Sequence, residues 1–111
     1  MTENNKLIAE FIGGYQYDNH DDFITFDETN NMFSYDTISL KNLKFHSDWN
    51  WLMEVVEKIN DLNNVVEIHE NHVRVVNNER SEVLVDVVEG SMLEATYNAC
   101  VEFVKLYNQN K

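Results

Sequence analysis

Cysteine, glycine and basic residues are scarce in this sequence, and each shortage excludes a class of protein. One cysteine among 111 residues forms no internal disulfide, so the chain is not a disulfide scaffold. The three glycines form no phosphate-binding loop, because Gly13 and Gly14 follow a predicted helix and no Gly-Lys-Ser or Gly-Lys-Thr occurs. The 8 Lys and Arg against 20 Asp and Glu give a net charge of −12, which disfavours direct binding to DNA, RNA or an anionic membrane.

Long apolar runs and a targeting segment are also missing. The longest apolar runs are a few residues, far below the roughly 20 that span a bilayer. The segment from Met1 to Lys6 has no basic stretch followed by an apolar one, so no signal peptide is predicted. We therefore expect a cytoplasmic protein.

The residues that are present suffice for one folded domain, residues 1–111. The chain is 43% hydrophobic and contains 6 Phe, 5 Tyr and 2 Trp, enough for a core. Its length fits one domain, and disorder of the whole chain is not expected despite the charge.

Apolar residues spaced three or four apart predict three helices, at residues 3–12, at residues 48–62, and over about 18 residues after Ser91. Thr2 and Ser47 are the expected caps of the first two helices. Ser91 followed by Glu94 is a capping box for the third. The segment 38–45 is ambiguous and admits one helical turn after Ser39.

Five strands are predicted, at residues 22–26, 32–35, 65–69, 73–76 and 83–88. The first two are expected to pair through a turn at residues 27–31. A two-residue turn at Glu70–Asn71 predicts the register of the next hairpin, with Ile68 opposite Val73, Val66 opposite Val75, and Glu67 opposite Arg74. The predicted fold is α+β: a mainly antiparallel sheet, made of a β-hairpin and a three-stranded meander, packed with two long helices and a short N-terminal helix.

The negative charge is concentrated in the first third of the chain. Residues 1–36 hold eight acids and one Lys, a net of −7, whereas residues 37–111 hold twelve acids and seven basic residues, a net of −5. Six acids lie within 19 residues that contain no Lys or Arg, namely Asp18, Asp21, Asp22, Asp27, Glu28 and Asp36. Such a surface attracts a basic partner by imitating the charges of a phosphate backbone, or it only keeps the protein soluble.

Other candidate sites are less well supported by the sequence. Residues 18–22 alternate oxygen ligands but lack the glycine and the final glutamate of a calcium loop. His69 and His72 face each other in the predicted hairpin, yet a closed zinc site needs about four ligands. His46 next to Ser47 and Asp48 is expected to start a helix rather than to form a catalytic group. No metal, cofactor or catalytic residue is therefore predicted.

Two further side chains are assigned from their helical positions. Cys100 falls on the apolar stripe of the last helix and is expected to be a small core residue. Trp49 and Trp51 point about 200° apart on one helix, so both cannot face the centre of one core. Two explanations stay open: one Trp is exposed, with Trp51 selected as a possible interface anchor, or the helix is sandwiched between the sheet and another helix.

Three segments carry a resemblance: LIAEFIG at residues 7–13, FHSDWNWLMEVVEKI at residues 45–59, and EATYNACVEF at residues 94–103. They resemble a family of small uncharacterised phage and prophage proteins, many from Bacteroidetes. The resemblance implies a phage or mobile-element origin and a bacterial host cytosol, and it implies no enzymatic activity and no site residues.

The sequence thus favours a small non-enzymatic interaction protein that inhibits a basic, nucleic-acid-binding host defence protein, as anti-CRISPR or anti-restriction proteins do. The expected contact residues are the six acids and Trp51. Two alternatives stay open: a self-associating phage accessory or structural protein, and a metal-binding protein or enzyme that uses His20, His46, His69 or His72.

Overall fold

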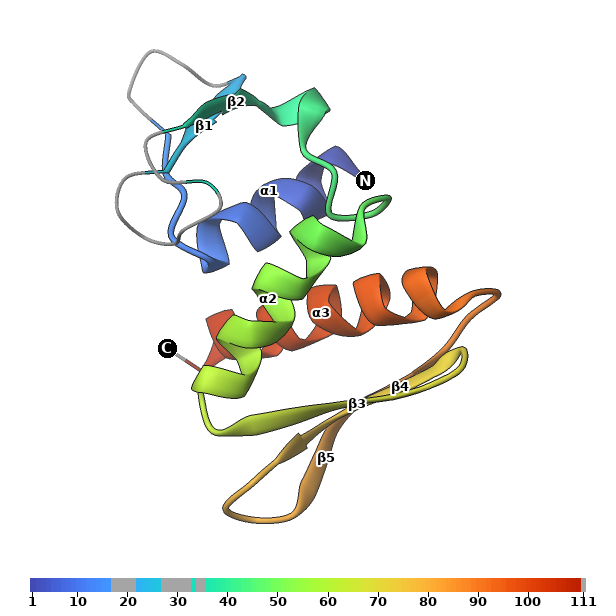
Figure 1. Cartoon of the computed structure of the whole chain (residues 1–111). Coiled ribbons are helices and arrows are strands. Elements are labelled where there is room, and N and C mark those ends of the chain that lie inside the picture. Colours follow the sequence, from blue (N-terminus) through green and yellow to red (C-terminus); the bar gives the residue numbers. More distant parts are fainter. Residues whose placement is uncertain (17–21, 27–32, 34–35, 111) are drawn as a thin grey trace.

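The computed structural model describes residues 1–16, 22–26, 33 and 36–110 (Figure 1). The elements, in chain order, are α1 (Thr2–Phe11), β1 (Phe23–Thr25), β2 (Thr37–Ser39), the 3₁₀ turn η1 (Leu40–Asn42), α2 (Trp49–Asp61), β3 (Asn64–His69), β4 (His72–Asn77), β5 (Glu82–Val88) and α3 (Met92–Gln109). Helices and antiparallel sheets in one chain make the fold α+β, which confirms the predicted class.

The larger sheet has the strand order β3-β4-β5, and both pairs are antiparallel. Its β3–β4 register is the predicted one, with Ile68 opposite Val73, Val66 opposite Val75, and Glu67 opposite Arg74. The predicted ion pair also forms, since an Arg74 guanidinium N–H donates to Glu67 Oε1 over 2.9 Å. Apolar pairs on one face and a charged pair on the other fix the register, because a one-residue slip would exchange the faces.

The domain is built in layers (Figure 1). The sheet β3–β5 lies at the bottom of the view, α2 and α3 cover one of its faces, and α1 with the β1–β2 sheet lies above them. Val73, Val75 and Val85 fill the covered face and are almost fully buried. On the other side of α3, the Phe11 ring packs against the rings of Phe103 and Tyr107, with centroids 6.0 and 5.3 Å apart.

The smaller sheet corrects one prediction. The partner of β1 is β2 at Thr37–Ser39, so the predicted pairing with residues 32–35 is wrong; of that segment the structure describes Phe33 alone, and the predicted turn at residues 27–31 lies outside the described residues. Ile38 stands opposite Ile24, and the hydroxyls of Thr25 and Thr37 lie 3.0 Å apart. These β-branched pairs favour the observed pairing. Phe33, which sequence reasoning placed in the strand, is a buried core side chain instead.

Two of the three predicted helix caps are wrong. Met1 is the N-cap of α1 and makes no side-chain capping bond, so Thr2 lies inside the helix. Asp48 rather than Ser47 caps α2, since its Oδ1 accepts the Asn50 backbone N–H over 2.8 Å. A carboxylate at this position accepts that bond and also interacts favourably with the helix dipole.

The cap of α3 and the core assignment of Cys100 are as predicted. The Glu94 backbone N–H donates to Ser91 Oγ over 3.1 Å. Cys100 is fully buried in the core, and this burial raises the pKa of its thiol to about 12. The thiol is therefore protonated at neutral pH, as an inert core residue requires.

A buried polar junction ties the N-terminal helix to the rest of the core. Asn5 Nδ2 donates to Leu43 O over 3.2 Å and lies 2.9 Å from His46 Nδ1, while the Tyr97 hydroxyl donates to Asn5 Oδ1 over 2.9 Å. Asn5 is only 3% exposed, so these bonds satisfy groups that water does not reach. The side chain thereby joins α1, the segment before α2, and α3.

Candidate functional site

Two of the six predicted acidic contact residues lie in the described part of the chain. Asp22 and Asp36 are exposed and precede β1 and β2, respectively. Their carbonyls accept backbone N–H groups from Leu40 and Phe26, each over 2.8 Å, so they stand at opposite ends of the small sheet. The structure does not bring this pair together. Asp18, Asp21, Asp27 and Glu28 lie outside the described residues, and the predicted acidic surface stays a prediction.

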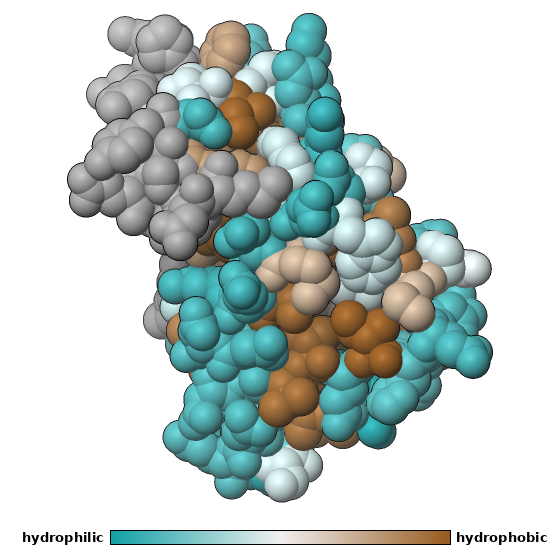
Figure 2. All heavy atoms as spheres, in the orientation of Figure 1, coloured by the Kyte–Doolittle hydropathy of each residue, from teal (hydrophilic) through white to brown (hydrophobic). Residues whose placement is uncertain are grey.

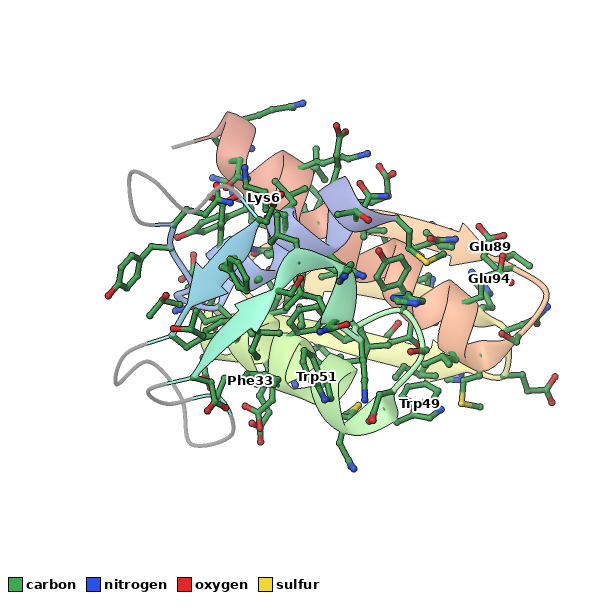
Figure 3. All side chains as sticks on the ribbon, turned by 90° about the horizontal axis from the view of Figure 1, so that it is seen from above. Lys6, Phe33, Trp49, Trp51, Glu89 and Glu94 are labelled. Carbon is green, nitrogen blue, oxygen red and sulfur yellow. The ribbon has the colours of Figure 1, made fainter. Side chains whose placement is uncertain are left out.

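Trp51 lies in an aromatic cluster at the edge of the core. Its ring centroid is 4.6 Å from that of Phe33 and 5.3 Å from that of Phe45. Figure 3 shows Trp51 beside Phe33, with Trp49 well apart from both. Trp49 is 37% exposed and Met53, one helical turn later, is 41% exposed. The ring contacts of Trp51 therefore give it a packing role. Trp49 has the more accessible indole of the two.

Of the four histidines considered from the sequence, His20 lies outside the described residues, and His46, His69 and His72 lie within them. His69 pairs with His72 at the hairpin end, as predicted, but His72 Nε2 hydrogen-bonds Asp86 Oδ1. His46 directs Nδ1 to Asn5. Within the described ranges, no three His, Cys, Asp or Glu side chains are grouped as metal ligands.

Sequence reasoning missed a groove that runs between β5 and α3. It consists of two adjoining hollows of about 670 and 620 Å³, which share Leu84 and Leu106. The first hollow follows β5 from Leu84 to Glu89 and is faced by one stripe of α3, at Asn98, Val101, Glu102 and Lys105. The second continues past the start of β5 toward Phe103 and Tyr107. The groove therefore runs along the whole length of β5.

β5 is an edge strand, since among the described residues it pairs with β4 alone. Hydrogen-bonded residue pairs alternate along an antiparallel ladder with pairs whose backbone groups point away from each other. The Glu89 N–H donates to Asn71 O over 3.1 Å, which assigns Glu89 to the hydrogen-bonded set. The alternation then directs the N–H and C=O groups of Asp86 and Val88 outward, along the groove.

The groove is acidic. Of the described residues that line it, Glu82, Asp86, Glu89 and Glu102 are acidic and Lys105 alone is basic. Figure 3 shows Glu89 beside Glu94 near the start of α3, so the negative charge continues past that end. Asn98 Nδ2 donates to Glu89 Oε2 over 2.9 Å, which holds this carboxylate in place.

The sequence pattern predicts one side of this groove, the acidic edge strand. The last strand of a predicted three-stranded meander is an edge strand, and Glu82, Asp86 and Glu89 lie in or beside it. The groove also requires the polar stripe of α3 to lie close to that edge. Its position depends on how the helix crosses the sheet, and the periodicity of the sequence does not predict this crossing.

Comparison with known proteins adds no assignment. No family model matches the chain, and comparison with curated proteins and with solved structures gives no match. Of the helices in the described residues, none combines the length and the apolar character of a membrane span. The phage-family resemblance therefore stays a prediction.

Proposed function

We propose that this is a small acidic interaction protein of phage type that binds a basic, nucleic-acid-binding host protein and inhibits it non-enzymatically, as anti-CRISPR or anti-restriction proteins do. The observation that carries the proposal is the groove beside β5, which is lined, among the described residues, by four carboxylates and one Lys. An anionic groove speeds encounter with a basic partner and competes for the surface that nucleic acid would occupy. The net charge of −12 acts in the same direction.

The test is a capture experiment from a bacterial host, followed by a competition assay on the captured protein. We expect a basic, nucleic-acid-binding protein whose DNA or RNA is displaced by this chain and whose affinity falls as salt is raised from about 50 to 300 mM. The proposal is overturned if the bound protein keeps its nucleic acid or binds equally well at both salt concentrations.

Charge variants identify the contact surface. One variant carries Glu82→Gln and Glu102→Gln in the groove, and a second carries amides in place of the six N-terminal acids. The matched control carries Glu57→Gln and Asp61→Asn, two exposed acids of α2 that do not line the groove. We expect the groove variant to weaken the complex and the control to leave it unchanged, while the N-terminal variant tests the contact set selected from sequence.

The second candidate function is self-association through an apolar face. Figure 2 shows hydrophobic side chains gathered where α2 meets β3. The exposed apolar residues of these elements include Trp49, Met53 and Val65. Light scattering tests the second function, since an inhibitor can act as a monomer, whereas a self-associating accessory or structural protein requires a dimer or larger assembly.

A further inference from the structure

We propose that β5 receives an extended basic segment of the partner, which adds a fourth strand to the β3–β5 sheet and places its apolar side chains in the groove against α3. This inference rests on the proposed function, because it specifies how the basic partner is held. It names the chemistry of the ligand: an unfolded or extended peptide with alternating basic and apolar residues. Addition of a strand to an exposed sheet edge beside a helix is a general mode of peptide recognition.

The backbone of β5 offers the hydrogen bonds that such a strand needs. The N–H and C=O groups of Asp86 and Val88 point outward from the ladder, as the bond from Glu89 N–H to Asn71 O requires. The opposite edge is different, since the outward N–H of Val66 on β3 donates to Asn60 Oδ1 over 3.2 Å. A side chain from α2 thus occupies part of the β3 edge. The β5 edge is the better acceptor of a new strand.

The groove matches the dimensions of an extended segment. β5 contains 7 residues, or about 23 Å at about 3.3 Å per residue, and a register shift against β4 interrupts its regular alternation near Leu84. Side chains of a strand alternate between faces, so every second residue of the incoming segment points toward α3. Those residues meet Leu84, Val101 and Leu106. The groove therefore selects small or branched apolar residues at alternate positions.

The charge of the groove determines which residues are favoured at the remaining positions of the incoming segment. Among the described residues, Glu82, Asp86, Glu89 and Glu102 line the rim together with one basic residue, Lys105, and His72 hydrogen-bonds Asp86. Lys or Arg in the incoming segment is therefore attracted, whereas Asp or Glu is repelled. A second copy of this chain is disfavoured as the occupant, because pairing β5 with β5 brings two acidic strands together and joins two molecules of charge −12.

The experiment uses a seven-residue peptide of alternating Lys and Val, with both ends blocked, titrated into the full chain. Binding is measured by calorimetry and mapped by amide chemical shifts and amide hydrogen exchange. We expect the shifts to centre on β5 and the groove side of α3, with slowed exchange at the outward amides of Asp86 and Val88. Replacing every Lys of the peptide with Glu is expected to abolish binding, and salt at about 300 mM is expected to weaken it at least about fivefold relative to 50 mM.

Two changes test the backbone bonds separately from the charge. Val88→Pro removes an outward N–H at a position that is 62% exposed and leaves the β4 ladder bonds intact. We expect at least about a tenfold loss of peptide affinity, whereas Val88→Ala, which keeps the N–H, changes affinity less than about threefold. The second change is made in the peptide, where N-methylation of alternate residues blocks strand pairing without altering the protein.

Three outcomes overturn the proposal: equal affinity for the Lys and Glu peptides, equal affinity for the methylated and unmethylated peptides, or shifts centred on Trp49 and Met53. Protection of the Asp86 amide that grows with protein concentration, without peptide, identifies a second copy as the occupant and also overturns it. The strand addition and the proposed function fail separately. A host partner that binds the Val88→Pro variant as tightly as the unchanged chain contradicts the strand addition and leaves the proposed function standing.

Discussion

Replacement of Asn5 by Ala tests whether the buried polar junction holds the N-terminal helix in place. The change removes the donor to Leu43 O and His46 Nδ1 and the acceptor for the Tyr97 hydroxyl. Leu43 and Tyr97 are buried, whereas His46 is half-buried. Each buried polar partner left unsatisfied costs about 1–3 kcal/mol, so the two buried ones predict a loss of about 2 kcal/mol or more. That is a large part of the roughly 5–15 kcal/mol by which a domain is stable.

Urea unfolding measures this loss, with Tyr97→Phe as the partner variant in a double-mutant cycle. We expect Tyr97→Phe alone to cost about 1–2 kcal/mol and to cost less when Asn5 is already Ala, with a coupling of about 1 kcal/mol. Asn4→Ala, on the same helix turn but half-exposed, is the control and is expected to change stability by less than about 0.5 kcal/mol. A loss below about 1 kcal/mol for Asn5→Ala, or strict additivity with Tyr97→Phe, would refute the role given to the junction.

The same geometry fixes the tautomer of His46. Leu43 O is an acceptor, so it must face the amide nitrogen of Asn5 rather than its oxygen. That nitrogen is also the atom near His46 Nδ1, which therefore accepts a hydrogen bond and leaves the ring proton on Nε2. Nitrogen-15 chemical shifts of the ring report this tautomer, and a proton on Nδ1 in the neutral ring would contradict the assigned amide orientation.

Three further predictions concern a cap, a thiol and the two indoles. Asp48→Ala is expected to destabilise the fold by about 1 kcal/mol in urea unfolding and Ser47→Ala by much less; equal losses would contradict the cap assignment. Burial raises the pKa of Cys100 from 9.0 to about 12, so the unfolded thiol ionises first and stability falls as the pH rises from about 9 to 12, by up to about 1.4 kcal/mol per unit. Cys100→Ala should flatten that slope, and an unchanged slope would reject the cause. Acrylamide should quench the indole fluorescence of the Trp51→Phe variant, which keeps Trp49, more strongly than that of the Trp49→Phe variant, which keeps Trp51.

Local sequence patterns predict the C-terminal two thirds of the fold well because the determinants there are short-range. The pairs Val66–Val75 and Glu67–Arg74 follow from one two-residue turn and from period-two alternation. The bond from the Glu94 N–H to Ser91 Oγ follows from the three-residue spacing of a helix start. In each case the residues that decide the structure are near neighbours in the chain or across one turn.

The N-terminal third is harder to predict because its contacts are distant in sequence. Thr37–Ser39 competes with residues 32–35 as the partner of β1, and both segments contain β-formers. Phe33 settles in the core against Phe45 and Trp51, which lie 12 and 18 residues later in the chain. Likewise, Asn5 acquires its role only from His46 and Tyr97, and no pattern around residue 5 indicates this.

The candidate site shows the same division. The sequence indicates acids on the last strand of the meander, but the groove requires the helix α3 to lie along that strand. An acidic edge strand also resists pairing with further copies of itself, which is a general protection against aggregation. Here the edge strand β5 lies beside apolar residues of the groove, Leu84, Val101 and Leu106. Protection against aggregation requires the charge but not these apolar residues. Charge that repels another acidic strand attracts a basic one, so the same side chains that keep the protein from self-pairing define the partner it accepts.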